Sequence, residues 1–326
     1  MGSVWIVLRT AGLGALWLVT CLAPAFGQAW PERAVKLVVP YPAGGNVDSA
    51  ARAIADKLQV TLGQSVIVEN KAGAGGLLGC EAVAKAPPDG YTLLVSTSGP
   101  VLFAPDTASR RAYEWRRDLS PITMISATPI VLQVHPAVKA KTVQELFELA
   151  RSEPGKLTMA SPGSATANYF LSEALQERFN LKWVTVQYKG NAPATNDLIA
   201  GHVQFSFDQL SVALPYIQAG QTRAIAVVAE KRSRWLPDVP SFAEAGIPDT
   251  DASTFTGLFA PAGTPAAIID RLNVEMAKIL TDPEVKNRFA VMSADTAPMK
   301  PQELKAALEK EEAAWLPTIR KLNIKQ

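Results

Sequence analysis

Short apolar runs alternate with longer amphipathic segments along most of the chain. The runs AVKLVVPY, SVIVENK and YTLLVSTS predict strands, and residues 49–62 and 77–85 between them predict helices. After the irregular stretch ASRRAYEWRRDLSPIT, the pattern restarts with KLTMASPGSATANYFLSEAL, KWVTVQYKGNAPATNDLIAG and HVQFSFDQL. Strands that alternate with helices are typical of a mostly parallel sheet flanked by helices. The pattern therefore predicts an α/β protein with two such units.

The second unit is expected to be an insertion in the first. A further strand, TFTGLFAPAG, and three helical stretches follow the second unit, and we assign them to the first. One lobe would then comprise residues 30–125 with 254–326, and the other residues 126–253. The segments that cross between the lobes are expected to include TPIVLQVHP and either TRAIAVVA or TFTGLFAP.

The first 29 residues differ in composition from the rest of the chain. They carry one early arginine, Arg9, an apolar run over residues 11–22 and small residues around 23–29. This pattern is typical of a cleaved secretory signal peptide. The apolar run is shorter than the roughly 20 residues that span a bilayer, and Thr20 is unusual before Cys21 in a lipoprotein signal. We therefore expect export to the periplasm with cleavage near residues 27–29, rather than anchoring by a helix or by a lipid on Cys21.

Composition and charge exclude several classes of protein. The 326 residues are 48% hydrophobic and 19% charged, which permits two packed cores. Basic and acidic side chains nearly balance, 32 against 30, so no nucleic-acid partner is expected. Cys80, the lone cysteine after export, is interpreted as a small buried residue rather than a nucleophile. Since the two histidines, His135 and His202, stand far apart, we expect no metal site, no catalytic triad and no cofactor.

Four turns share one arrangement, in which glycines or small residues join a strand to a helix. They are YPAGGN, NKAGAGGLLG, ASPGSATAN and YKGNAPATN, two in each half of the chain. Glycine lets a ligand approach the backbone, and the free N–H groups of a helix start favour an anion. In open parallel sheets, ligands bind beyond the carboxyl ends of the strands. We therefore expect the turns to face one another across an anion-binding cleft, although each turn alone is equally compatible with a tight connection that holds no ligand.

The second turn also contains GAGGLLG, which is similar to a dinucleotide-binding fingerprint. That fingerprint requires an acidic residue near the end of the following strand to hold the ribose. Ser96, Thr97 and Ser98 occupy that place here, which argues against a nucleotide site.

Residues at the predicted turns and strand ends are the candidate ligand contacts. In the first lobe we expect backbone and hydroxyl donors, with one aromatic wall, from Ala43, Gly44, Gly45, Asn46, Ser96, Thr97 and Tyr41. In the second lobe we expect donors and turn-shaping residues from Ser161, Gly163, Ser164, Thr166, Gly190, Asn191 and Pro193. Asp208, at the end of the strand FSFD, either accepts a hydrogen bond from a ligand amine or hydroxyl, or holds a local group such as Lys189. Asp48 is interpreted as a helix-start charge, and Arg52 as a surface residue.

Longer motifs give the chain a resemblance to a known family. WPERAVKLVVPYPAGGNVDSAAR, VIVENKAGAGGLLG, AKAPPDGYTLL, QYKGNAPATNDLIAGHVQFSFD and KRSRWLPDVPSFAEAG resemble the Bug-type, TctC-like periplasmic solute-binding proteins of tripartite tricarboxylate transport systems. The resemblance covers nearly the whole chain after residue 29. It implies a two-lobed type II periplasmic-binding-protein fold, the Venus flytrap, without catalytic activity. It also implies a small carboxylate ligand, such as a dicarboxylate, an amino acid or an aromatic acid, and membrane transporter subunits as partners.

The chain departs from the family pattern at three positions near the predicted cleft. Val47 stands where family members usually carry threonine, Ala165 where they carry glycine, and Tyr169 where they carry histidine. These departures leave the identity of the ligand open. The same scaffold also serves sensory proteins that present a ligand to a membrane partner, and an enzyme on it would need a positioned acid or base in the cleft. We expect a monomeric binder that delivers its ligand to a transporter.

Overall fold

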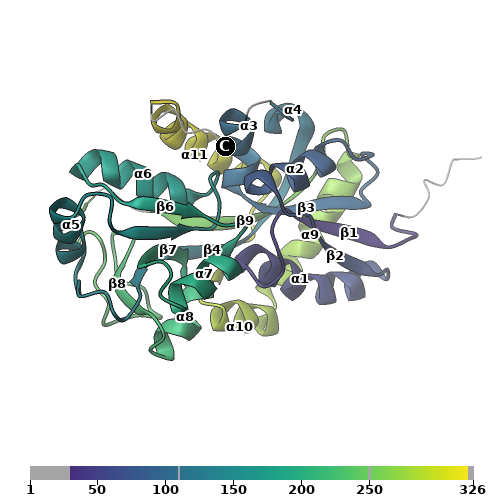
Figure 1. Ribbon diagram of the computed structural model, residues 1–326. Helices are drawn as coiled ribbons and strands as arrows, with labels where there is room; N and C mark the ends of the chain where they lie inside the picture. The colour runs from purple at the N-terminus through teal and green to yellow at the C-terminus, as the bar shows by residue number, and fades with distance from the viewer. Residues whose placement is uncertain (1–29, 109–110, 249, 251, 322–326) are drawn as a thin grey trace, which may run out of the picture.

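The computed structural model describes residues 30–108, 111–248, 250 and 252–321, which form two lobes (Figure 1). The first strands of the chain lie on the right in Figure 1, and the strands from the middle of the chain lie on the left. The predicted signal peptide and Cys21 fall outside the described residues. Within the described ranges, no helix combines the length and the apolar character needed to cross a membrane.

Three parallel strands start the sheet of the first lobe. β1 (Val35–Val39) lies between β2 (Val66–Asn70) and β3 (Thr92–Thr97) and pairs with both. β3 pairs on its other side with β9 (Ser253–Pro261), which runs antiparallel to it. All of β1 except Lys36 is buried, as expected for a central strand between two layers of helices. Through β9, the chain returns to this sheet near residue 253.

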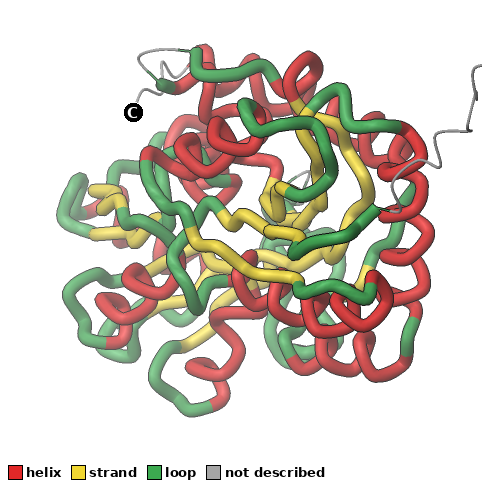
Figure 2. Tube along the Cα trace, turned by 90° about the vertical axis from the view of Figure 1, so that its right-hand side faces the viewer, coloured by secondary structure: helices red, strands yellow, loops and turns green. Residues whose placement is uncertain are grey.

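Helices surround the strands of the first lobe (Figure 2). α1 (Asn46–Leu62) ends at Gly63, whose φ of 69° is the left-handed conformation that glycine adopts easily. Ile54 and Leu58 of α1 are fully buried in the core beneath it. The other helices joined to this lobe are η1 (Ala74–Gly76), α2 (Leu77–Ala84), α9 (Ala266–Thr281), α10 (Pro283–Val291) and α11 (Pro301–Lys321).

The second lobe repeats the parallel arrangement. β5 (Thr158–Ser161) lies between β6 (Val184–Gln187) and β7 (Phe205–Gln209) and runs parallel to both. The other elements of this lobe are α5 (Val143–Ser152), α6 (Ala167–Phe179), α7 (Asn191–Ile199), α8 (Leu210–Gln218) and β8 (Arg223–Val227). The start of each of α1, α2, α6 and α7 follows one of the four turns identified in the sequence.

One long strand, β4 (Leu119–Val134), connects the two sheets. Residues 119–129 of β4 pair with β9, whereas residues 130–134 pair with β7 and β8. The strands follow the order β2-β1-β3-β9-β4-β7-β5-β6, and the two-residue strand β10 (Asp295–Thr296) also pairs with β4. The chain crosses once along β4 and returns at the start of β9, where Ile130 N–H donates to Ala252 O. TPIVLQVHP and TFTGLFAP therefore lie at the crossings.

β4 begins earlier than the sequence pattern predicted. Its first residues, 119–123, fall in the stretch that was expected to be irregular. Pro121 lacks the N–H group of a regular strand, and the pairing with β9 shifts register between Pro121 and Thr123 and again between Met124 and Ser126. Short helices fill the region before β4: η2 (Gly99–Phe103), α3 (Ala104–Thr107) and α4 (Trp115–Asp118).

Apolar packing joins the two lobes beside β4. Phe103 of η2 and Phe170 of α6 meet edge to face, with 5.2 Å between their ring centroids. Both belong to a buried cluster that also contains Leu308 of α11. At Gly99, an added Cβ would come within 2.0 Å of Ala165 O in the other lobe. The two lobes are therefore in direct contact beside β4.

Candidate ligand-binding cleft

The turn YPAGGN carries the chain from β1 to the start of α1. Gly45 is the N-cap of α1, with an extended backbone at φ −86° and ψ 176°. Ser49 N–H donates to Gly45 O at 3.0 Å, so the N–H groups of Asn46, Val47 and Asp48 have no acceptor within the helix. The start of α1 therefore presents free donors and a partial positive charge.

Asp48 makes its hydrogen bonds within this turn. Its carboxylate accepts from Gly44 N–H at 2.9 Å, Arg52 Nε at 3.0 Å and Asn70 Nδ2 at 2.9 Å. Burial opposes ionisation of Asp48, but these bonds outweigh burial and lower the pKa of the carboxyl group. The geometry agrees with a helix-start charge. It also means that Gly44 N–H, a candidate ligand donor, is already used by Asp48.

Tyr41 and Thr97 reach the cleft, whereas Ser96 is directed away from it. The Tyr41 hydroxyl lies 3.4 Å from Thr97 Oγ1, and both residues line a cavity between the lobes. Ser96 is fully buried, donates to Thr97 O at 3.2 Å and lies 3.8 Å from Cys80 Sγ. Neighbouring residues of a strand point to opposite faces, which explains why Ser96 is not placed to meet a ligand. Ala43 also lines neither of the two cleft cavities.

The turn ASPGSAT uses its hydroxyl groups internally. Ser161 Oγ donates to Gly163 O at 3.2 Å, and Thr166 Oγ1 donates to the same oxygen at 2.7 Å. Thr166 is the N-cap of α6 and accepts from Tyr169 N–H at 3.3 Å. The two hydroxyls therefore hold the shape of the turn rather than pointing free donors at a ligand. The N–H groups that remain without a helical acceptor are those of Ala167 and Asn168.

The turn before α7 is shaped by close approach of the other lobe. Gly190 is the N-cap of α7 with φ 138°, and a Cβ there would lie 3.0 Å from Pro42 Cδ in the first lobe. Glycine is required both for this backbone conformation and for this contact. Pro193 lies in the first turn of α7, where a missing N–H costs no helical hydrogen bond.

Asp208 is buried beneath the start of α7 and lines neither cleft cavity. Its carboxylate accepts from Asn191 Nδ2 at 2.5 Å, Gln209 N–H at 2.8 Å and Thr195 Oγ1 at 3.2 Å. Burial raises the pKa of Asp208 to about 7, although these hydrogen bonds favour the ionised form. Of the two roles left open by the sequence, the geometry favours the structural one, with Asn191 rather than Lys189 as the group that Asp208 holds.

We expect the Asp208→Asn variant to be more stable than the wild type above about pH 7. The pKa of Asp208 rises from 3.8 to about 7 on folding. Between these two pH values the folded state binds more protons than the unfolded state, so the free energy of unfolding of the wild type falls as the pH rises. Asparagine keeps an acceptor for Asn191 and Gln209 N–H, offers a donor to Thr195, and carries no charge. The variant should gain up to about 4 kcal/mol relative to the wild type. Urea unfolding at pH 4 and pH 8 measures this gain, and a difference that does not widen with pH contradicts it.

In the described part of the chain, two cavities are found between the lobes. The smaller, about 10 Å³, is lined at the starts of three helices by Asn46 and Val47 of α1, by Thr166, Ala167 and Asn168 at α6, and by Asn191 of α7. Its volume is that of about one water molecule. The larger, about 200 Å³, is lined by Gly163 and Ser164 from one lobe and by residues 73–76 from the other. This volume is below the roughly 300 Å³ at which pockets for drug-sized ligands begin, so it suits a small solute.

Asn46 is the most informative side chain of the smaller cavity. It is 5% exposed, and its Oδ1 accepts from Ser211 Oγ of the second lobe at 2.7 Å. Its Nδ2 is buried and has no partner in the described part of the chain. An unpaired buried amide costs free energy, about 1–3 kcal/mol. The cavity therefore contains a donor that lacks the acceptor a ligand would supply.

The candidate residues proposed from the sequence fall into two groups. Tyr41, Asn46, Thr97, Thr166, Asn191, Gly163 and Ser164 line the cleft cavities. Ala43, Gly44, Gly45, Ser96, Ser161, Gly190, Pro193 and Asp208 do not line them, and act instead through the turns or the buried network. Gly45 lies close to the smaller cavity, since a Cβ added there would be 3.5 Å from Oδ1 of Asn191, which lines that cavity.

Several lining residues were not among the sequence candidates. The second turn, residues 73–76, lines the larger cavity together with Gln187, Tyr188 and Lys189. The glycines of this turn follow the same pattern of strand, glycine and helix as the other turns, and this pattern would have been sufficient to include them among the candidate residues. Gln209 and Thr254 line the smaller cavity. No local pattern marks these two, because only the pairing of β4, β7 and β9 brings them to the cleft.

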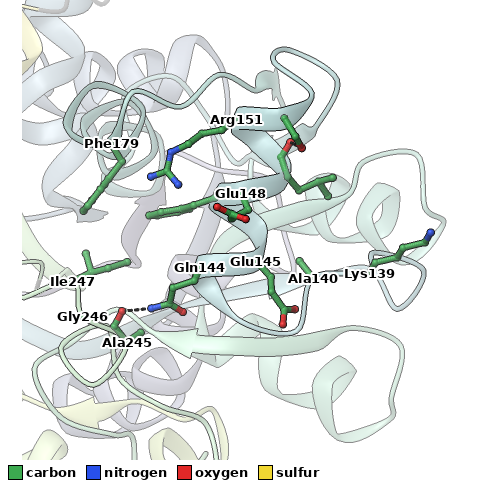
Figure 3. A pocket seen from close by; sticks show the side chains of 13 residues that line it. Lys139, Ala140, Gln144, Glu145, Glu148, Arg151, Phe179, Ala245, Gly246 and Ile247 are labelled. Atoms are coloured by element: carbon green, nitrogen blue, oxygen red, sulfur yellow. Dashed lines mark hydrogen bonds between the residues drawn. The ribbon is translucent and has the colours of Figure 1, made fainter.

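A larger and more open cavity, about 790 Å³, lies outside the cleft on the second lobe (Figure 3). It is bordered by α5 and residues 245–247, and Gln144 donates a hydrogen bond to Ala245 O across it (Figure 3). Glu145, Glu148 and Arg151 place charges of both signs around it. It contains no contribution from the first lobe, so the paired helix starts single out the smaller cavities in the cleft as the candidate site. In the described ranges, no group of three His, Cys, Asp or Glu side chains is arranged to hold a metal ion.

The sequence of the chain was compared with those of known proteins. Residues 50–324 match the family described as the tripartite tricarboxylate transporter family receptor. Protein BugT of Bordetella pertussis is 32% identical over 326 residues, which cover 100% of this chain and 98% of that protein.

Solved structures of similar proteins share the whole fold. The periplasmic binding protein BugD superposes with a TM-score of 0.85 at 32% identity, over 91% of this chain and 99% of that one. Rpa4515 of R. palustris with adipate gives 0.87 at 31% identity, over 91% and 99% of the two chains. MatC (Rpa3494) from Rhodopseudomonas palustris with bound malate gives 0.85 at 31% identity, over 89% and 100%. The two-lobed periplasmic-binding-protein fold implied by the sequence motifs is therefore confirmed.

Proposed function

Because the chain belongs to the tripartite tricarboxylate transporter receptor family, we propose that it is an extracytoplasmic solute-binding protein that captures a small carboxylate between its lobes. The observation that carries this proposal is the convergence of the starts of α1, α6 and α7 on one cavity that also holds the unpaired amide nitrogen of Asn46. A carboxylate, directly or through one ordered water in this small cavity, would satisfy the free N–H groups and the partial positive charge together. The adipate and malate in two similar structures, both small carboxylates, support this class of ligand.

The helix starts supply enough free energy for binding without a cluster of arginines. Each helix N-terminus carries roughly half a positive charge, and a hydrogen bond to a charged group contributes about 1.5–3 kcal/mol. Four such bonds give roughly 6–12 kcal/mol before the costs of association and ordering. Micromolar affinity requires about 8 kcal/mol. Lys189, which lines the larger cavity as an exposed cation, adds at most about 1–2 kcal/mol.

The remaining parts of the proposal concern organisation and partners. Residues 1–29 act as a signal peptide that is removed on export to the periplasm. The lobes comprise residues 30–125 with 254–326, and residues 126–253, a division supported by the separate sheets on the two halves of β4. The mature protein is a monomer that leaves its ligand chemically unchanged and delivers it to the membrane subunits of a transporter. The description of the matching family as a transporter receptor supports that delivery.

A thermal-shift screen of small carboxylates tests the proposed function. A ligand at a hundred times its dissociation constant should stabilise the protein by about 2.7 kcal/mol, which raises the melting temperature by several degrees. The neutral amides of the same acids are the matched controls and should give no shift, because they cannot pair with the partial charges of the helix starts. Chromatography of the bound ligand should recover it unchanged. If no carboxylate shifts the melting temperature, or if the amides shift it equally, the proposal is wrong.

A further inference from the structure

We propose that three buried hydroxyl groups on the strands that join the lobes oppose contact between the lobes, and thereby lower the affinity of the cleft for its ligand. They belong to Ser126 and Thr128 of β4 and to Thr256 of β9. All three residues line neither of the two cleft cavities. This inference rests on the proposed function, because it concerns a ligand held between the lobes.

The three hydroxyl groups lie on one face of the sheet, together with two further threonines. In the antiparallel pairing of β4 with β9, Ser126 stands opposite Thr256, and Thr128 stands opposite Thr254. Thr256 is also paired with Thr97 at the end of β3. Residues directly opposite each other share a face, as do alternate residues of one strand. The five side chains therefore form one continuous patch across three strands, which we call the hydroxyl belt.

The hydroxyl belt separates two apolar cores along the strands that cross between the lobes (Figure 1). On β4, Ile125 precedes the belt and belongs to the core of the first lobe, whereas Ile130 follows it and belongs to the core of the second lobe. Leu258 of β9 likewise belongs to the first core, and Ala252, just before β9, to the second. The belt therefore lies at the junction of the lobes, where a change in their relative position acts.

The hydroxyl groups of the belt are only partly hydrogen-bonded. Those of Thr97 and Thr254 have side-chain partners. The hydroxyl oxygens of Ser126, Thr128 and Thr256 are buried and have no hydrogen-bond partner in the described part of the chain. A buried hydroxyl group without a partner costs free energy, because it has lost its hydrogen bonds to water.

This cost belongs to the arrangement in which the lobes touch. In that arrangement Ser211 Oγ of the second lobe donates to Asn46 Oδ1 of the first at 2.7 Å. Thr97 and Thr254 of the belt line the smaller cavity between the lobes. Separation of the lobes would widen this cavity and bring water to the face of the sheet that carries the belt. The unpaired hydroxyl groups would then be hydrated, so the belt stabilises the separated arrangement relative to the one in contact.

A cost on lobe contact lowers the affinity for a ligand that both lobes hold. Such a ligand binds only the arrangement in which the lobes are in contact. Its apparent dissociation constant is the intrinsic constant divided by the fraction of the protein in that arrangement. The unpaired hydroxyl groups reduce this fraction. Their removal should therefore tighten binding without altering any contact to the ligand.

Substitutions that remove the unpaired hydroxyl groups test this inference. Ser126→Ala, Thr128→Val and Thr256→Val remove the oxygen and keep a side chain of similar shape, which strands tolerate. We expect each variant to bind the best carboxylate of the thermal-shift screen about three- to tenfold more tightly than the wild type, and the triple variant at least about 30-fold more tightly. Calorimetric titration measures these ratios.

Thr123→Val is the matched control on the same strand. Thr123 is fully buried, but its Oγ1 donates to Met299 O at 2.9 Å and accepts from Met299 N–H at 3.1 Å. This hydroxyl group is paired within the first lobe, whatever the position of the second lobe. Its removal should lower the midpoint of urea unfolding and leave the affinity within about twofold of the wild type.

Small-angle X-ray scattering without ligand measures the position of the lobes directly. The radius of gyration of the unliganded triple variant should be smaller than that of the unliganded wild type, and closer to that of the wild type with ligand. If no carboxylate binds to any of the proteins, the proposed function is wrong, and the scattering alone then decides whether the belt opposes lobe contact.

Two results would overturn the inference. In the first, the belt variants have the affinity and the radius of gyration of the wild type. In the second, they lose as much stability as Thr123→Val and keep the wild-type affinity, which would mean that ordered water pairs with these hydroxyl groups while the lobes touch. The three single variants are independent of one another, so those that circular dichroism shows to be folded carry the measurement.

Discussion

The Gly45→Val variant is expected to bind the best carboxylate of the screen at least about 100-fold more weakly than the wild type while remaining folded. Gly45 has φ −86°, a conformation open to valine, so the substitution introduces no backbone strain. Its Cβ would lie 3.5 Å from Asn191 Oδ1 across the cleft. The two methyl groups beyond this Cβ then occupy the space between the starts of α1 and α7. A loss of 100-fold corresponds to about 2.7 kcal/mol, close to the contribution of one or two charged hydrogen bonds.

Graded controls separate a blocked cleft from a disturbed helix. Gly45→Ala adds only the Cβ, at an ordinary contact distance, and should keep the affinity within about tenfold of the wild type. Gly163→Val should also prevent binding, since a Cβ there lies 3.8 Å from Gly75 Cα of the other lobe. Gly163 has φ 153°, however, so valine also strains that turn. The position at Gly45 therefore gives the cleaner test. Calorimetry measures the affinities, and circular dichroism verifies the fold.

Substitutions that remove a single cation test the alternative, in which an ion pair rather than main-chain donors holds the ligand. Arg52 is bound to Asp48 and Asn70, and Lys189 is exposed at the larger cavity. Arg52→Met and Lys189→Met should each cost at most about 1–2 kcal/mol of binding free energy. If either substitution alone destroys binding while Gly45→Val binds normally, the ligand is held by an ion pair. The main-chain donors of the YPAGGN turn would then not be the principal contact.

The elements that form the cleft could be predicted because their signals are local. A strand, one or two glycines and an amphipathic helix appear together in the sequence, and each such turn was found where the structure has a helix start. The anion-binding character follows from helix geometry alone. For that reason the turns at Gly45, Gly163 and Gly190 were identified without knowledge of the partner lobe.

The roles of individual polar side chains could not be predicted, because they depend on contacts between distant residues. Ser96 and Thr97 are neighbours in sequence, yet only Thr97 reaches the cleft. Successive side chains of β3 point to opposite faces of the sheet, and only the folded structure shows which face lies toward the cleft. Asp208 was considered as a ligand contact, but the folding of α7 over the end of β7 buries it under Asn191. The hydrogen bonds from Gln209 to Asn168 and Thr254 likewise require β7, α6 and β9 to meet.

The Asn46→Asp variant is expected to show the largest loss of carboxylate affinity, about 1,000-fold or more. Asn46 Oδ1 accepts from Ser211 Oγ of the other lobe, and aspartate keeps this acceptor in place. A negative charge at the first position of α1 also favours the helix, so the fold should be retained. The variant replaces the unpaired Nδ2 by a charged oxygen. It therefore removes a hydrogen bond of about 1.5–3 kcal/mol and adds a repulsion of about 4 kcal/mol between charges some 4 Å apart.

Two further measurements assign this loss to charge rather than to shape. Asn46→Ala removes the same hydrogen bond without adding a charge, and its loss should stay within about 10–150-fold, the range of a single charged bond. In Asn46→Asp, the buried carboxyl next to a bound anion should have a raised pKa. Protonation of the introduced carboxylate would convert it to a donor, so the affinity of this variant should recover as the pH falls from 8 to 5, while Asn46→Ala shows no such recovery. Equal losses in the two variants at pH 8, with no recovery at pH 5, would mean that the ligand carboxylate does not lie against α1, and that Ser211 is the only group Asn46 serves.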